Sequence, residues 1–144
     1  MNKTELYNMI LNIEDLREPL KNDEIIGLSV RSDYDLMDLV LPIDQTMNIG
    51  KNVWEVSAKI LIRKGNEELI KILDNILEWT QDLNWPGSES ILRKICEFPK
   101  EVILPKIDEL ITQAENKGDI DWKHALSMAK NKILYNKEID RVWI

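Results

Sequence analysis

The sequence contains very few of the residues that form covalent cross-links, metal sites and nucleophilic centres. Among its 144 residues there are one cysteine, Cys96, and one histidine, His124. A single cysteine excludes an intrachain disulfide and any zinc site built from several cysteines. Such sparing use of cysteine is typical of a reducing compartment, so we expect a cytoplasmic protein.

Long apolar runs and the common catalytic motifs are also absent. No stretch approaches the roughly 18 apolar residues of a membrane-spanning helix, and Glu5 interrupts the segment where a signal peptide needs a continuous apolar core. There is no glycine-rich phosphate loop, no GxSxG elbow and no HExxH pair. We therefore expect no membrane contact, no metal, no cofactor and no catalytic residue.

The composition is that of a soluble globular protein. Hydrophobic residues make up 44% of the chain and charged residues 31%, which is too apolar for intrinsic disorder. A chain of 144 residues has the usual size of one domain. We expect residues 1–144 to fold as a single domain.

The net charge of −7 is concentrated near the N-terminus. Residues 1–50 carry four basic and ten acidic side chains, a balance of −6, whereas residues 123–144 carry five basic and two acidic ones, a balance of +3. An acidic surface repels nucleic acid and attracts basic proteins, chiefly by faster association. We expect a protein partner and no nucleic acid, although acidity also serves solubility.

Helical periodicity in the first fifty residues is divided by prolines. An apolar stripe begins after Thr4 and predicts a helix that ends before Pro19. Residues 22–30 fit either a short helix or a strand, and we favour the helix. Residues 33–40 are predicted as another helix, stopped by Pro42.

From residue 53 onward the pattern is more regular. One helix is expected to end at Gly65 in a left-handed conformation, and Asn66 is expected to cap a second helix that runs to Trp79. Pro86 and Pro99 stand where each would open a helix. The remaining expectations are a bend or restart at Pro105, a polar linker over residues 115–121 and a helix that contains Trp122.

Three tryptophans mark an internal repeat. Trp54, Trp85 and Trp122 each stand at the start of a predicted helix and are separated by 31 and 37 residues. Helix pairs with periods of roughly 30 to 50 residues indicate an α-solenoid. We predict an all-α fold with helix-pair repeats over residues 51–135, an acidic helical cap over 1–50 and a C-terminal cap over 136–144.

The segment 76–86, ILEWTQDLNWP, resembles the signature of a small bacterial family of unknown function with a HEAT-like helical-repeat fold. Residues 102–110 and 118–126 are similar to the family's continuation, while Thr80 and Gly87 depart from its pattern. The resemblance implies a HEAT-like α–α superhelix, a short solenoid, and implies no reaction. The matched positions are Leu77, Trp79, Gln81, Asp82, Asn84, Trp85 and Pro86.

The remaining chemical candidates have plain structural alternatives. Trp79 and Trp85 suit a partner surface, but their helical spacing favours the core. Glu78 and Asp82, four residues apart on one helix face, resemble an acid–base pair or half a metal site, although a solvated capping role fits better.

His124 is the one residue that could serve as a metal ligand or a catalytic base. With Asp119 and Asp121 it would form only a sparse metal site. With Cys96 it would form a nucleophile and base, but Cys96 lies on an apolar helix face, so we expect a buried, inert thiol.

The acidic run Asp33, Asp35 and Asp38, beside Tyr34, is the strongest candidate for partner binding, with Glu78 and Asp82 as further contacts. The alternative is the polar face of an amphipathic helix. We expect a non-catalytic binding module, most specifically an immunity-type protein that neutralises a toxin. The alternatives are a structural subunit of a larger assembly and a HEAT-like enzyme that modifies nucleic acid.

Overall fold

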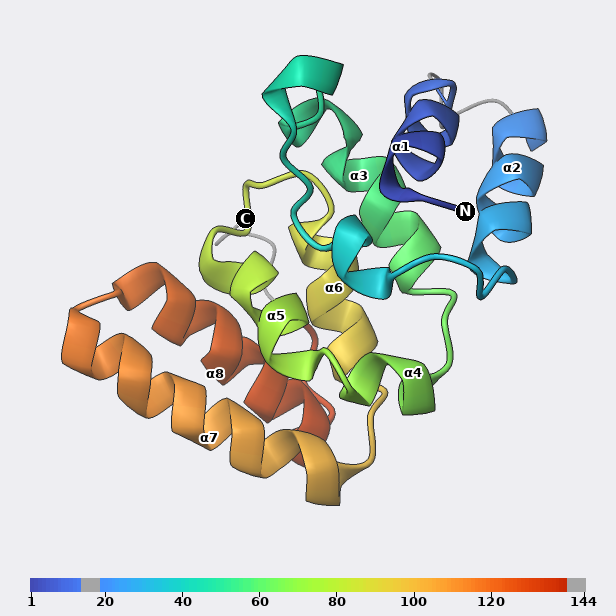
Figure 1. Cartoon of the computed structure of the whole chain (residues 1–144). Coiled ribbons are helices and arrows are strands. Elements are labelled where there is room, and N and C mark those ends of the chain that lie inside the picture. Colours follow the sequence, from blue (N-terminus) through green and yellow to red (C-terminus); the bar gives the residue numbers. More distant parts are fainter. Residues whose placement is uncertain (14–18, 140–144) are drawn as a thin grey trace.

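The computed structural model describes residues 1–13 and 19–139, and within these ranges the chain is helical with no strand (Figure 1). The predicted all-α class is therefore confirmed. None of the helices in this part of the chain is both long and apolar enough to cross a membrane. The elements are α1 (Lys3–Leu11), α2 (Pro19–Ser29), η1 (Leu36–Leu39), η2 (Gln45–Met47), α3 (Lys51–Leu61), α4 (Asn66–Ile70), α5 (Leu73–Glu78), η3 (Trp79–Gln81), α6 (Ser88–Ile95), α7 (Lys100–Lys117) and α8 (Ile120–Tyr135).

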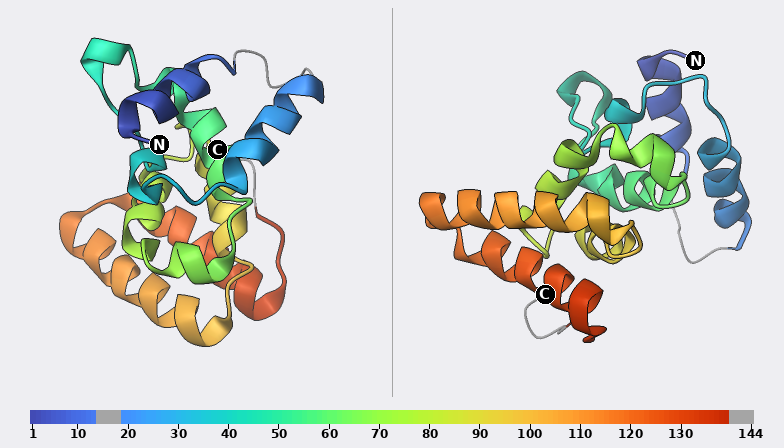
Figure 2. Two further views of the ribbon diagram at one scale, coloured as in Figure 1. Left: turned by 45° about the vertical axis from the view of Figure 1, so that its right-hand side comes forward. Right: turned by 90° about the horizontal axis from the view of Figure 1, so that it is seen from below.

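The helices α1 and α2 form one end of the molecule, and the α7–α8 pair forms the other (Figure 2). Both N-terminal helices pack on α3. Asn2 begins α1, because its side-chain oxygen accepts a hydrogen bond from the amide of Glu5 at 2.8 Å. α2 ends at Ser29, so the helix predicted at residues 22–30 is confirmed except at its last residue, and its Ile25 and Leu28 are buried.

Residues 33–40 do not form the predicted α-helix. Asp35 has an extended backbone, and its side chain accepts a hydrogen bond from the amide of Met37 at 2.9 Å. Such a local bond competes with the helical ladder, and only the short 3₁₀ turn η1 follows. η1 is anchored on α3 by the fully buried Leu39.

The helix predicted from Asn66 to Trp79 is divided into α4 and α5 by a turn at residues 71–72, and its last residue, Trp79, begins the 3₁₀ helix η3. Leu69 before the turn and Leu73 after it are both buried. Gly65 has φ −69°, so the predicted left-handed helix end is wrong, and Gly65 instead stands at the start of α4. Asn66 is the first residue of that helix rather than its cap.

The corner between η3 and α6 is fixed by Trp79, whose side chain has no solvent exposure. Its indole N–H donates to the carbonyl of Pro86 at 2.9 Å, and the Ser88 hydroxyl donates back to the Trp79 carbonyl at 2.8 Å. The indole ring of Trp54 meets the ring of Trp79 edge-on, with centroids 6.3 Å apart. These contacts close the corner over one buried aromatic pair.

Gly87 makes this closure possible. Its φ of +84° is left-handed, and a Cβ atom there would lie 2.5 Å from the Ala58 Cβ and 2.9 Å from the Trp54 carbonyl oxygen. Only glycine fits both the conformation and the space. α6 accordingly begins at Ser88, and the prediction that Pro86 opens this helix is wrong.

The three tryptophans of the proposed repeat occupy different positions. Trp54 and Trp122 lie in the first turns of α3 and α8, but Trp85 precedes α6 and is half-buried. The Trp54 indole donates to the Pro42 carbonyl at 2.8 Å, and the Trp122 indole donates to the Thr80 hydroxyl at 3.1 Å. Sequence spacing therefore aligned residues that make unlike contacts.

The α7–α8 hairpin is the longest helix pair. α7 continues through Pro105, so the predicted restart is wrong. Proline lacks the backbone N–H that would donate to the carbonyl of Glu101, and this residue lies in the exposed first turn of the helix. Gly118, with φ +68°, ends α7, and the Asp119 carboxylate caps α8 by accepting from the Trp122 amide at 3.1 Å. The linker is therefore much shorter than residues 115–121.

One continuous cluster of buried apolar residues runs from Leu6 of α1 to Ile139 beyond α8. α8 ends at Asn136 in a left-handed conformation. Ile139 is buried and is the last residue described, so most of the predicted C-terminal cap lies outside the described residues.

Candidate functional site

The residues predicted to bind a partner lie in three separate places. Asp33 to Asp38 lie between α2 and α3, Glu78 ends α5, and Asp82 follows η3. The prediction that Glu78 and Asp82 share one helix face is wrong, because a 3₁₀ turn intervenes and Asp82 has extended backbone with φ −137°. These two carboxylates therefore do not extend the acidic run into one site.

Asp82 and Glu78 line different hollows. The Asp82 carboxylate accepts from the Asn84 amide at 2.8 Å, as expected of a turn residue, and borders a polar hollow of about 90 Å³ with Asp121 and His124. Glu78 borders a hollow of about 220 Å³ between α5 and α7. Neither place holds three side chains arranged as metal ligands, nor does any other place in the described ranges.

Asp33 is exposed but already paired. The Arg31 guanidinium donates to both carboxylate oxygens of Asp33, at 2.9 and 2.6 Å, in a bidentate arrangement. The Met1 ammonium donates to the Asp33 backbone carbonyl at 2.8 Å. The hydrogen bonds from Arg31 hold the pKa of the Asp33 carboxyl well below its usual range.

Lys64 attaches this acidic run to the rest of the protein. Only 4% of its surface is exposed, and its ammonium donates to the backbone carbonyl of Arg31. The same nitrogen lies 4.9 Å from the centre of the Tyr34 ring, a cation–π contact. Burial lowers the pKa of Lys64, because the charged ammonium is partly removed from water.

Tyr34 and Tyr7 hold the run from two further directions. The Tyr34 hydroxyl donates to the Leu28 carbonyl at 2.6 Å, and the Tyr7 hydroxyl of α1 donates to the Asp38 carbonyl at 2.8 Å. Burial raises the pKa of each phenol to about 12. Both hydroxyls therefore remain protonated donors at neutral pH.

Among the acidic residues of this run, Asp35 and Asp38 have different environments. Asp35 is exposed and caps η1. Asp38 is half-buried, and burial, with a smaller contribution from the nearby Asp35, raises the pKa of its carboxyl. Asp33 and Asp35 are the carboxylates that solvent reaches most readily.

Cys96 is half-buried rather than fully buried. Its thiol donates to the Leu92 carbonyl at 3.3 Å, and burial raises its pKa to about 11. The thiol is therefore protonated at neutral pH, which agrees with the expected inert side chain.

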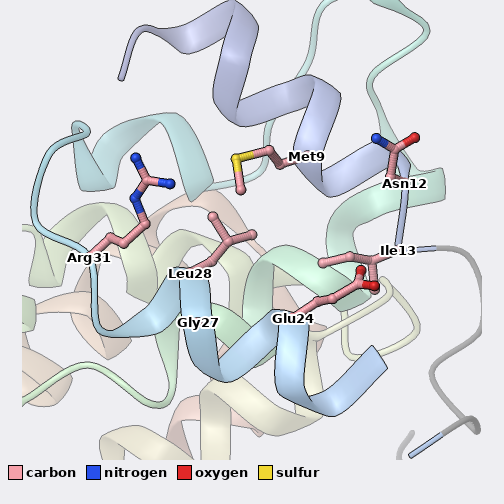
Figure 3. A pocket seen from close by; sticks show the side chains of 7 residues that line it. All are labelled: Met9, Asn12, Ile13, Glu24, Gly27, Leu28 and Arg31. Atoms are coloured by element: carbon pink, nitrogen blue, oxygen red, sulfur yellow. The ribbon is translucent and has the colours of Figure 1, made fainter. Parts of the chain in front are cut away.

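A groove of about 390 Å³ separates α1 from α2, and sequence reasoning missed it (Figure 3). Met9 and Ile13 line it from α1 or its end, and Leu28 from α2. Gly27 at its floor leaves open space, since a Cβ atom there would meet nothing within 4 Å. A lone glycine within a helical pattern was the available signal.

Comparison with known proteins divides the chain at the start of α3. Residues 51–139 match a family described as a domain of unknown function (DUF5071). The chain belongs to this family. No curated protein and no solved structure matches the chain significantly. The match agrees with the expected family of unknown function, while the acidic run and the groove both lie outside the matched residues.

Proposed function

We propose that this chain is a non-catalytic protein-binding domain, most specifically an immunity-type protein that neutralises a basic toxin by direct binding. The observation that carries the proposal is the acidic run, Asp33 to Asp38, which lies in the most acidic third of the chain and outside the family domain. Complementary charge accelerates association with a basic surface.

The acidic run also suits binding because its backbone is held in place before any partner arrives. Tyr7, Tyr34 and Lys64 each anchor it through a hydrogen bond to a different carbonyl. A segment that is already ordered loses less conformational entropy on binding than a mobile one. This arrangement supports a rapid and specific encounter.

The proposal includes a short HEAT-like superhelix as the scaffold and the cytoplasm as the location. The antiparallel α7–α8 pair supports the first, since helix pairs of this kind are the units of α-solenoids. The single cysteine of the sequence supports the second.

The test uses the polypeptide encoded by the adjacent gene as the candidate partner. We expect a stoichiometric complex whose association rate falls as salt rises. The triple variant Asp33→Asn, Asp35→Asn, Asp38→Asn should slow association by about tenfold or more. The control is the triple variant Glu97→Gln, Glu101→Gln, Glu115→Gln, which removes the same amount of charge from α7 and the turn before it. This variant should change the association rate much less.

Other outcomes identify the competing functions. Self-association of the purified chain at micromolar concentration would favour a structural subunit. Retention of duplex DNA at moderate salt would favour a nucleic-acid enzyme. A partner that binds the Asp33→Asn, Asp35→Asn, Asp38→Asn variant as rapidly as the unmodified chain would contradict the role of the acidic run.

A further inference from the structure

The solvent-facing side of α2 carries two apolar residues, Ile26 and Val30, at the outer edge of the molecule (Figure 1). Val30 directly follows the helix, and its amide donates to the Ile26 carbonyl at 3.2 Å, so the two residues keep helical spacing and share one face. They are 40% and 77% exposed, and Val30 is the most exposed large apolar side chain in the part of the chain that the structure describes.

This apolar pair is not what fixes α2 to the rest of the protein. The helix packs on α3, and its buried apolar residues are Ile25 and Leu28. An amphipathic helix normally turns polar residues toward water on its remaining faces. Ile26 and Val30 therefore form a small apolar surface that folding alone does not require.

Exposed carboxylates lie on either side of the apolar pair in the chain. Asp23 stands three residues before the pair and so on the same face of α2. On the other side, Arg31 is paired with Asp33, so Asp35 is the exposed carboxylate that follows. A complementary partner therefore presents an apolar patch bordered by lysine or arginine.

The chain around Val30 is held in place without a partner. The buried Lys64 donates to the carbonyl of Arg31, the next residue along, and the Tyr34 hydroxyl donates to the Leu28 carbonyl at 2.6 Å. Valine also has a restricted side chain, because it is branched at Cβ. An apolar side chain that is fixed in this way loses little conformational entropy when a partner covers it.

The carboxylates and the apolar pair should affect different steps of binding. Attraction between charges acts over roughly 8 to 10 Å at physiological salt, so exposed carboxylates raise the rate of association. Burial of apolar surface is favourable only once the two proteins are in contact, so it lowers the rate of dissociation. The acidic run alone gives a rapid encounter, whereas a lasting complex needs an apolar contact.

We propose that the solvent-facing side of α2 is the centre of the partner-binding surface, where Ile26 and Val30 make the apolar contact that holds the complex together. The occupant is a protein surface with an apolar patch bordered by basic side chains. The proposal rests on the proposed protein-binding function and adds the residues that determine how long the complex lasts.

The first test measures the kinetics of the complex with the polypeptide encoded by the adjacent gene. Val30→Ser keeps the net charge and should raise the dissociation rate constant about tenfold or more, with little change in the association rate constant. The Asp33→Asn, Asp35→Asn, Asp38→Asn variant should mainly lower the association rate constant. Surface plasmon resonance with the full chain measures both constants.

The matched control is Ile120→Ser, which also replaces an exposed apolar residue by serine. Ile120 is 69% exposed at the start of α8, in the helix pair at the opposite end of the molecule (Figure 2). This variant should leave both rate constants unchanged. Circular dichroism and thermal unfolding should show that Val30→Ser is folded, because the side chain that it replaces is mostly in water.

The second test needs no natural partner. A displayed library of random twelve-residue peptides is selected for binding to the immobilised full chain. The selected peptides should combine lysine or arginine with large apolar residues. In fluorescence anisotropy they should bind Val30→Ser about tenfold or more weakly than the unmodified chain, and Ile120→Ser equally well.

Where the complex with the adjacent gene's product forms, its kinetics decide. A dissociation rate that Val30→Ser changes no more than Ile120→Ser does would overturn the proposal, as would dimerisation of the unmodified chain that Val30→Ser abolishes. Where no such complex forms, the immunity function fails and the library decides. Peptides that depend on Val30 would then support this surface, whereas peptides that bind Val30→Ser undiminished, or no enrichment at all, would overturn it.

Discussion

The region up to residue 50 and the family domain at 51–139 are held together by different interactions. In the family domain, interlocking tryptophans do much of this work: Trp54 and Trp79 are both buried, and each indole N–H is satisfied by a backbone carbonyl. In the N-terminal region, hydrogen bonds hold a solvated acidic segment: the half-buried Tyr34 donates to the Leu28 carbonyl, and the buried Lys64 of the family domain donates to the Arg31 carbonyl. The family domain is closed around its tryptophans, and the N-terminal region keeps an open groove.

Under the proposed protein-binding function, this difference indicates where adaptation to a partner would be tolerated. Close packing at the tryptophan corner leaves no room for an added methyl group at Gly87, whereas Gly27 has open space around it. The family domain is suited to serve as a constant support, and the preceding region is suited to carry the specific contacts.

The largest effect is expected from Trp79→Ala. Trp79 is fully buried and donates to Pro86, so its truncation should lower the free energy of unfolding by about 3 to 5 kcal/mol. Trp85→Ala, at a half-buried position, should cost roughly 2 kcal/mol. Urea unfolding of the two variants measures both values, and equal losses would contradict this ranking.

The same substitution at two glycines should have opposite signs. Gly87→Ala places a methyl group against Ala58 and Trp54 in a left-handed conformation and should cost about 3 kcal/mol. Gly27→Ala should instead stabilise the protein by up to about 1 kcal/mol, because alanine favours α2 and meets no neighbour. Thermal unfolding compares them. A destabilised Gly27→Ala would show that the groove floor is already in contact.

Lys64→Met should increase the local mobility of the acidic run without unfolding the family domain. The substitution removes the donor to the Arg31 carbonyl and the contact with the Tyr34 ring, at a cost of about 1 to 3 kcal/mol. Hydrogen exchange should accelerate at amides 31–35 and stay unchanged in α7 and α8. Lys64→Arg should restore part of the protection, and uniform acceleration throughout the chain would contradict a local role.

The last difference is expected at alkaline pH, where the effect again originates in the N-terminal region. Burial raises the pKa values of Tyr7 and Tyr34 to about 12 from the ordinary value of 10.0. The unfolded chain therefore ionises first, and stability should be unaffected by these groups below pH 10 and should decline between about pH 10 and 12. Urea unfolding across this range measures the decline, which Tyr34→Phe should make shallower.

A stability that is level over the same pH range would contradict the burial of these phenols. Absorbance at 295 nm, which follows tyrosine ionisation directly, provides the independent check.

Long elements with clear apolar periodicity were predictable from the sequence. α8 and most of α7 were correctly placed, as was the helical class, because their stripes match the face that each helix buries. The break at residues 71–72 and the short η1 were not predictable from periodicity. The first lies within an unbroken apolar pattern, and the second depends on the Asp35 cap.

The candidate site was predicted only in part. The acidic run is in the sequence, but its attachment through Lys64 joins residues more than thirty positions apart and has no local signature. The groove depends on how α1 and α2 diverge over α3, which only tertiary structure determines. Sequence spacing likewise placed Trp85 beside Trp54 and Trp122 as an equivalent position, because spacing contains no information on burial.

The shared apolar cluster has a consequence for how this domain is inherited. Leu6, Ile10 and Ile25 lie in the same buried cluster as Val53 and Ile60, although the family boundary falls between them at residue 51. A relative that lacks the first fifty residues must therefore cover the outer side of α3 with some other polypeptide. The family match therefore spans less of this chain than its buried apolar cluster, which also includes residues of α1 and α2.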